Sequence, residues 1–243
     1  MYQPRTYRHW VKDKDLVSFQ VVLKETDLHI RAQSNLKTEA LWAIQECRAP
    51  LERYIERHPS FLTALEPVPV AKDAPKIVKE MAEAGQKAGV GPMAAVAGAI
   101  AECVGRELMR FSPEVIVENG GDIFLNTLKP RLVGVYAGGS PFTGKIALQI
   151  EAEETPLGIC TSSGTVGHSL SFGRADAVIV LSPSAAVADA VATAIGNLIK
   201  NAADIPKGIN FAQGIPGLKG ILIIKDDKLG LWGRVRICKV NES

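Results

Sequence analysis

A single carboxylate interrupts a long apolar segment in the second half of the chain. Residues 185–199 read AAVADAVATAIGNLI, in which Asp189 is the one charged residue and Thr193 follows four positions later. Burying an ionised carboxylate is costly unless it is paired, hydrogen-bonded or bound to a metal ion. Residues four apart share one face of a helix, so Asp189 and Thr193 can present hard oxygen ligands together. The other interpretation is an aspartate favoured by the helix dipole, because Ser-Pro-Ser at 182–184 precedes it closely.

A second group of chemically useful residues occupies positions 118–122, Glu-Asn-Gly-Gly-Asp, between two strand-like runs. Asn-Gly between alternating apolar residues is a leading signal for a hairpin turn. Paired glycines also adopt backbone conformations closed to other residues and let a ligand approach the main chain. Both interpretations stay open, and Asp122 just beyond the glycines favours a site.

A third group, residues 158–168, reads GICTSSGTVGH and is expected to be a small, hydroxyl-rich loop. Its backbone N–H groups and hydroxyls suit a phosphate or a ring carbonyl, although a polar surface turn has the same composition. Cys160 or Ser162 as nucleophile with His168 as base is a further alternative. The Gly-x-Ser-x-Gly spacing of a nucleophile elbow is absent.

Composition limits the class of protein. A chain of 243 residues with 47% hydrophobic and 22% charged residues can bury a sizeable core, as one domain over 1–243 or as two halves of about 1–90 and 91–243. A net charge of +2 with dispersed basic residues argues against a nucleic-acid partner. Neither a signal peptide nor a membrane span is indicated, so a cytoplasmic protein is expected.

The cysteines show no pattern that indicates a disulfide framework or a zinc site. Cys47, Cys103, Cys160 and Cys238 are scattered without Cys-x-x-Cys spacing. We expect reduced thiols, most of them buried.

Elements of both kinds must position these residues. Apolar spacing predicts helices at 38–56, with a kink or break at Pro50, and at 75–87, 92–111, 185–199 and 204–213. Strand-like runs occur at 16–23, 28–32, 115–118, 123–127, 132–136, 145–152, 177–181, 220–225 and 230–240. The pattern predicts an α+β fold with mostly antiparallel sheets packed against helices. Hairpins at both ends with helical pairs between them suggest a duplicated unit.

The order of three motifs, at 118–123, 161–164 and 188–194, resembles the FAD:protein FMN transferase (ApbE-like) family, once called thiamine biosynthesis lipoproteins. The chain looks most like a shorter branch of that superfamily, over about residues 91–200. The resemblance implies an ApbE-like fold, bound FAD or FMN, and Mg²⁺ held by Asp189 and Thr193. The implied catalytic residues are Asp122 and His168. The implied flavin-binding residues are Asn119, Gly120, Gly121, Asp122, Thr161, Ser162, Ser163 and Gly164.

Two departures from the family pattern argue against transfer of FMN to a protein. The usual Lys-Gly pair is replaced by Ala97-Gly98, with Glu102 near the position of the family's acidic residue. The His-x-x-Asp-Pro segment is also absent, and Asp176, which lies in that region, is better explained as a salt-bridged loop residue.

Three functions therefore remain open. The first is a Mg²⁺-dependent enzyme that transfers a phosphoryl or nucleotidyl group of a flavin nucleotide or a related diphosphate. The second is a ligand-binding or assembly protein that keeps the fold without the chemistry. A cysteine or serine hydrolase is a minor third. Apolar helices with little charge make a homo-oligomer plausible.

Overall fold

The centre of the molecule is an eight-stranded sheet whose neighbouring strands are all antiparallel. The computed structural model describes residues 15–164 and 173–240. Strand order in the sheet follows chain order. The strands are β1 (Val17–Leu23), β2 (Thr26–Ala32), β3 (Val115–Asn119), β4 (Asp122–Asn126), β7 (Leu157–Ser162), β8 (Ala177–Ser182), β9 (Gly220–Lys225) and β10 (Lys228–Gly233).

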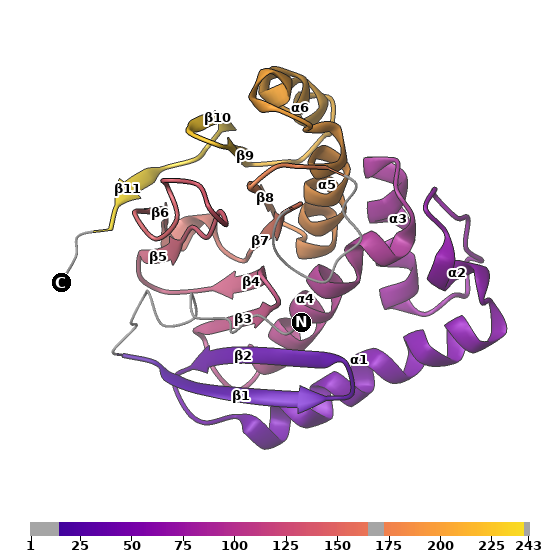
Figure 1. Cartoon of the computed structure of the whole chain (residues 1–243). Helices are drawn as coiled ribbons and strands as arrows, with labels where there is room; N and C mark the ends of the chain where they lie inside the picture. The colour runs from indigo at the N-terminus through magenta and orange to yellow at the C-terminus, as the bar shows by residue number, and fades with distance from the viewer. Residues whose placement is uncertain (1–14, 165–172, 241–243) are drawn as a thin grey trace.

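A three-stranded sheet of order β11-β6-β5 packs on one face of the large sheet, and helices pack on the other (Figure 1). Its strands are β5 (Arg131–Gly134), β6 (Ile146–Ile150) and β11 (Ile237–Lys239). The helices are α1 (Lys37–Arg57), α2 (Ser60–Thr63), α3 (Lys76–Ala88), α4 (Val96–Leu108), α5 (Ala185–Leu198) and α6 (Ile205–Gln213). Short 3-10 turns are η2 (Pro92–Ala95), η3 (Ala152–Glu154) and η4 (Ala202–Asp204). The predicted α+β class with mostly antiparallel sheets is confirmed.

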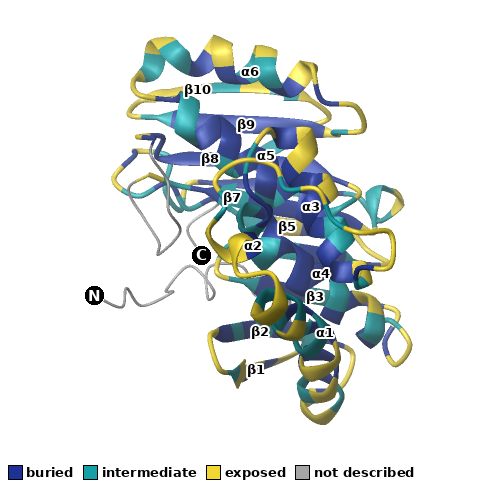
Figure 2. Ribbon diagram, turned by 90° about the vertical axis from the view of Figure 1, so that its right-hand side faces the viewer, coloured by how far each residue is buried: buried dark blue, intermediate teal, exposed yellow. Residues whose placement is uncertain are grey.

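Alternation along the strands divides the core in two. Phe124 and Cys160 face the helical layer, whereas their neighbours Leu125 and Ile159 face the small sheet. Figure 2 shows strands β8 and β9 almost wholly buried, whereas exposed residues lie on α6, on α1 and on the edge strand β1. Helix α5 is buried along most of its length, which explains why its sequence carries so little charge.

Two expectations about elements were wrong, and one of the two outcomes expected at Pro50 is excluded. Helix α1 is not broken at Pro50, because this residue lies partly exposed where water can reach the carbonyl freed by its missing N–H. Residues 157–162 form strand β7 rather than a loop, since their backbone pairs with β4 on one side and with β8 on the other. The segment expected as one strand over 230–240 is divided at Gly233, whose φ of 82° turns the chain from β10 into β11.

The expectation of four free thiols was also wrong. Cys47 on α1 and Cys103 on α4 form a disulfide with their Cα atoms 6.2 Å apart. The two residues are 56 positions apart in sequence, so only the packing of α1 on α4 brings them together. Cys160 is a buried free thiol and Cys238 a partly exposed one.

Within the described ranges, no single helix is long and apolar enough to cross a membrane. Helix α3 together with η2 and α4 has the length and composition, but this pair is bent by 104°.

Candidate functional site

The β3–β4 hairpin places two polar side chains beside its turn, where these two inner strands of the large sheet end. Asn119 and Asp122 are paired across it, with Gly120 and Gly121 as the turn at φ values of 68° and 110°. A two-residue turn with positive φ at both positions strongly favours glycine. The hairpin interpretation of this motif is therefore confirmed. Asn119 Nδ2 donates a hydrogen bond of 3.1 Å to the Ala97 carbonyl, which joins the hairpin to the start of α4.

Asp122 is a buried carboxylate with an unsatisfied oxygen. The residue is 8% exposed, and its Oδ1 has no hydrogen-bond partner in the described part of the chain. Burial raises the pKa of Asp122 to about 7, and the charge of Glu118 acts in the same direction. The neighbouring Cys160 thiol and a hydrogen bond from the Thr161 backbone N–H oppose this rise. An oxygen in this state is suited to a cation or to a hydrogen-bond donor of a ligand.

Asp189 is a second carboxylate beside the first. Its Oδ2 accepts a hydrogen bond of 2.9 Å from Gly98 N, at the beginning of α4. Burial raises the pKa of Asp189 well above its usual range, and the nearby charge of Asp122 raises it further. Backbone N–H groups of Gly98 and Ala97 act against this shift. Among the described ion pairs, none involves Asp122 or Asp189, so the two charges repel each other without compensation.

Glycines allow the elements around this pair to approach closely. A Cβ atom on Gly98 would lie 2.3 Å from the Ala185 carbonyl oxygen and 2.9 Å from Asp189 Cβ. A Cβ atom on Gly158 of β7 would lie 2.4 Å from Ala185 Cα. The first residue of α5 thus lies in close contact with both α4 and β7.

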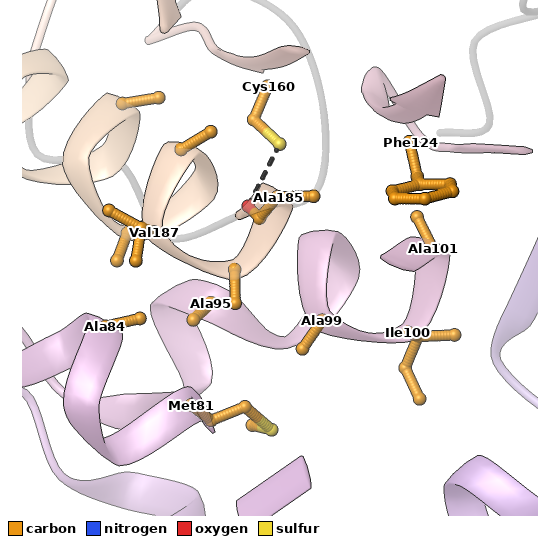
Figure 3. Close-up of a cluster of buried hydrophobic side chains, with 14 of the residues drawn as sticks. Met81, Ala84, Ala95, Ala99, Ile100, Ala101, Phe124, Cys160, Ala185 and Val187 are labelled. Carbon is orange, nitrogen blue, oxygen red and sulfur yellow. Dashed lines mark hydrogen bonds between the residues drawn. The ribbon is translucent and has the colours of Figure 1, made fainter. Parts of the chain in front are cut away.

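The buried thiol of Cys160 lies near both carboxylates. Its Sγ donates to the Ala185 carbonyl oxygen at 3.2 Å, and Figure 3 shows this contact among the buried alanines Ala95 and Ala99. Burial, followed by the charges of Asp122 and Asp189, raises the pKa of the Cys160 thiol well above its usual value. Because the thiolate is the nucleophilic form, these surroundings disfavour the hydrolase interpretation.

The remaining predicted residues lie around this centre in different ways. Thr193 is one helical turn beyond Asp189 on α5 and is partly exposed. Thr161 and Ser162 are neighbours on β7, so their side chains point to opposite faces of the sheet, and Ser162 shares the face of Cys160. Ser163 and Gly164 follow the strand, where Gly164 N donates to the Ala175 carbonyl oxygen at 2.9 Å. His168 lies outside the described residues.

Two further acidic residues have clear structural partners. Asp176 Oδ2 accepts from Asp226 N at 2.5 Å and lies 3.6 Å from Lys225 Nζ, which confirms the salt-bridged interpretation. Glu102 is 4% exposed, and its carboxylate accepts hydrogen bonds from the backbone at the beginning of α5. Helix α4 also carries Arg106 and Glu107, so Glu102 lacks the isolation in sequence that singled out Asp189.

The donor set fits Mg²⁺ better than a transition metal. In the described ranges, no three His, Cys, Asp or Glu side chains are arranged to hold a metal ion. Mg²⁺ is commonly bound by one or two carboxylates together with substrate phosphates and water. The unpaired Asp122 oxygen, the Asp189 carboxylate and the nearby Thr193 hydroxyl are ligands of that kind. A phosphate-bearing ligand would complete the coordination.

Comparison with protein families gives one match over most of the chain. The family model described as AbpE bacteria matches residues 8–209. A UPF0280 protein of Methanocaldococcus jannaschii is 43% identical over 224 residues, which are 89% of this chain and 90% of that protein. A UPF0280 protein of Methanopyrus kandleri is 42% identical over 226 residues, covering 90% and 91%.

Solved structures with the same fold are more distant in sequence. The apo flavinyl transferase ApbE of Pseudomonas stutzeri superimposes with a TM-score of 0.61 at 14% identity, covering 89% of this chain and 93% of that one. The ApbE protein of Thermotoga maritima gives 0.59 at 14% identity, covering 88% and 96%. Identity this low shows a common fold alone.

Proposed function

Because this chain belongs to the AbpE bacteria family, we propose that it binds a flavin nucleotide or a related nucleotide diphosphate together with Mg²⁺ at the Asp122–Asp189 pair. We further propose that it catalyses phosphoryl or nucleotidyl transfer there. The observation that carries the proposal is the unpaired, buried Oδ1 of Asp122 beside a second uncompensated carboxylate. Such a pair is stable as two ions only when a cation lies between them. The flavinyl transferase folds support a flavin nucleotide as the ligand class.

The residues have separate roles in this proposal. Asp189, fixed by Gly98 N, and Thr193 hold the ion from α5. When bound, Mg²⁺ neutralises phosphate charge and stabilises the charge that develops during transfer. Asp122 offers its unpaired Oδ1 to the same ion from β4. Gly120 and Gly121 leave the main chain at the hairpin open to a ligand.

Transfer of FMN to a protein is not part of the proposal. Ala97 occupies the position where the family usually has a lysine, and the His-x-x-Asp-Pro segment is absent. A second candidate function rests on the same two departures: without that lysine and that segment, the chain binds the nucleotide but does not turn it over.

Calorimetric titration of the purified protein with FAD, FMN, ADP and ATP, with and without Mg²⁺, tests binding. We expect Mg²⁺-dependent binding that is lost in Asp189→Ala and kept in Asp227→Asn, an exposed carboxylate paired with Lys228. Chromatography of the incubated nucleotides then separates turnover from binding alone. Absence of binding to all four nucleotides, or equal binding by Asp189→Ala, would overturn the proposal.

A further inference from the structure

Helices α4 and α5 are joined by two reciprocal bonds between a carboxylate and a backbone N–H. Asp189 of α5 accepts from Gly98 N of α4 at 2.9 Å. One turn towards the C-terminus of α4 and one turn towards the N-terminus of α5, Glu102 of α4 accepts from Ala185 N of α5 at 2.7 Å. Gly98 and Glu102 are four residues apart, as are Ala185 and Asp189, so the two bonds lie at corresponding positions of the crossing.

Glu102 Oε2 is the acceptor for most donors at the start of α5. Besides Ala185 N, it lies 3.1 Å from Ser184 Oγ and 3.4 Å from Ala186 N. These N–H groups have no partner inside the helix, and a negative charge at this end is favoured by the helix dipole. The other Glu102 oxygen is paired with Arg106 on α4. Both oxygens are therefore occupied, and the carboxylate is fixed.

The helix that carries Glu102 is itself anchored. Cys103, the next residue, is bonded to Cys47 of α1, and Gly105 on α4 packs against the ring of Phe124 on β4. Helix α4 is thus tied to α1 and to the sheet. Because α4 is fixed in this way, its contacts with the first turn of α5 determine the position of α5 along the axis of α5.

We propose that Glu102 is a positioning residue for the metal site, which sets Asp189 against Asp122 by fixing the first turn of α5. This inference rests on the proposed function, because it concerns the same ion. Glu102 contacts four groups of α4 and α5 but neither carboxylate of the pair, so it acts through the helix. Loss of its carboxylate frees Ala185 and lets Asp189 drift from the distance that a shared ion requires.

Titration with Mn²⁺ alone, followed by its electron paramagnetic resonance signal, measures the effect directly. Glu102→Ala should weaken Mn²⁺ binding by about 10- to 100-fold, the range typical of lost outer-shell support. Glu102→Gln keeps an oxygen that accepts from Ala185 N, so it should retain most of the affinity. The matched control is Glu114→Gln: Glu114 is also buried and paired with an arginine, Arg131, but it lies away from α5.

Circular dichroism at the titration temperature shows whether each variant is folded, and so distinguishes unfolding from a loss of positioning. Every variant is titrated where it is fully folded, and Glu102→Met, which keeps the length of the side chain without an acceptor oxygen, replaces Glu102→Ala if the alanine variant does not fold. Weaker Mn²⁺ binding in Glu102→Ala, with Glu102→Gln and Glu114→Gln close to the wild type, supports the proposal. Wild-type affinity in folded Glu102→Ala overturns it while leaving the proposed function intact. No Mn²⁺ binding by the wild type overturns the proposed function itself.

Discussion

Gly98 N donates a hydrogen bond to Asp189 Oδ2 at 2.9 Å, and this contact exists only because residue 98 has no side chain. A Cβ atom at this position would lie 2.3 Å from the Ala185 carbonyl oxygen. One glycine therefore both brings α4 against α5 and supplies a donor to the candidate metal ligand. The helix crossing and the site share the same atoms.

Replacement of this glycine should be costly. Gly98→Ala forces α5 away from α4, so we expect the free energy of unfolding to fall by about 1–3 kcal/mol, as in other overpacked cores. Urea denaturation measures the loss. Gly139→Ala is the control, because a Cβ at Gly139 meets nothing within 4 Å. Equal stability of the two variants would show that the crossing is not as tight as described.

The raised pKa of Asp122 predicts a dependence of stability on pH. A carboxyl whose pKa is about 7 in the fold and 3.8 as the ordinary value holds more protons folded than unfolded between these limits. Its contribution to stability therefore falls as pH rises from about 4 to about 7, by at most about 1.4 kcal/mol per pH unit. Asp122→Asn should lack this component.

Urea denaturation of the wild type and Asp122→Asn in EDTA, across that range, checks the sign. Carboxylates with a lowered pKa, such as Glu114, are stabilising when ionised and lose that contribution only at lower pH. The difference between the two proteins thus isolates Asp122. A difference that stays constant with pH would contradict the shift.

Asp189→Asn should stabilise the ion-free protein at pH 8. The substitution removes a buried charge that repels Asp122 and keeps an oxygen to accept from Gly98 N. A gain on the order of 1 kcal/mol would raise Tm by about 2–4 °C for a chain of this size. Asp176→Asn, which loses an ion pair with Lys225, should lower Tm instead. A lower Tm for Asp189→Asn in EDTA would mean that Asp189 has a partner of its own.

The disulfide between Cys47 and Cys103 predicts a cross-linked peptide. Proteolysis without reductant, followed by mass spectrometry, should recover the two cysteines in one fragment. Cys47→Ser should lower the free energy of unfolding by roughly 2–4 kcal/mol, because the link closes a long loop. Recovery of both cysteines as free thiols from protein purified without reductant would contradict this pairing.

Cys160 should resist alkylation in the folded protein. Its thiol is fully buried and its pKa is raised, so iodoacetamide at pH 8 should label Cys238 first and Cys160 only after unfolding. Peptide mapping gives the order. Rapid labelling of native Cys160 would revive the hydrolase interpretation.

Sequence patterns predicted the parts of the fold that depend on local order. Both hairpin strands at the N-terminal side, helices α3 to α6 and the Gly120-Gly121 turn all follow from periodicity or turn chemistry. Asp189 was identified because a lone charge in an apolar helix is conspicuous in sequence alone.

The features that local sequence patterns did not predict depend on tertiary contacts. Strand β7 contains glycine, threonine and serine, which are typical of loops, and it is a strand because β4 and β8 pair with it on either side. The Cys47–Cys103 bond and the contact of Glu102 with Ala185 join residues far apart in sequence. Their detection required the helix packing itself.

The pairing of β4 with β7 also determines when the site can exist. The segment between β4 and β7 contains β5 and β6. It follows Gly98, Asn119 and Asp122 in the chain and precedes Cys160 and Asp189. Pairing of β4 with β7, for example Ile123 with Ile159, joins the two ends of that segment and brings these two groups of residues together. A folding intermediate with either half of the sheet alone contains only one of the two carboxylates. We therefore expect the proposed capture of an ion by this pair to be a late folding event, whose rate would report the joining of the two halves.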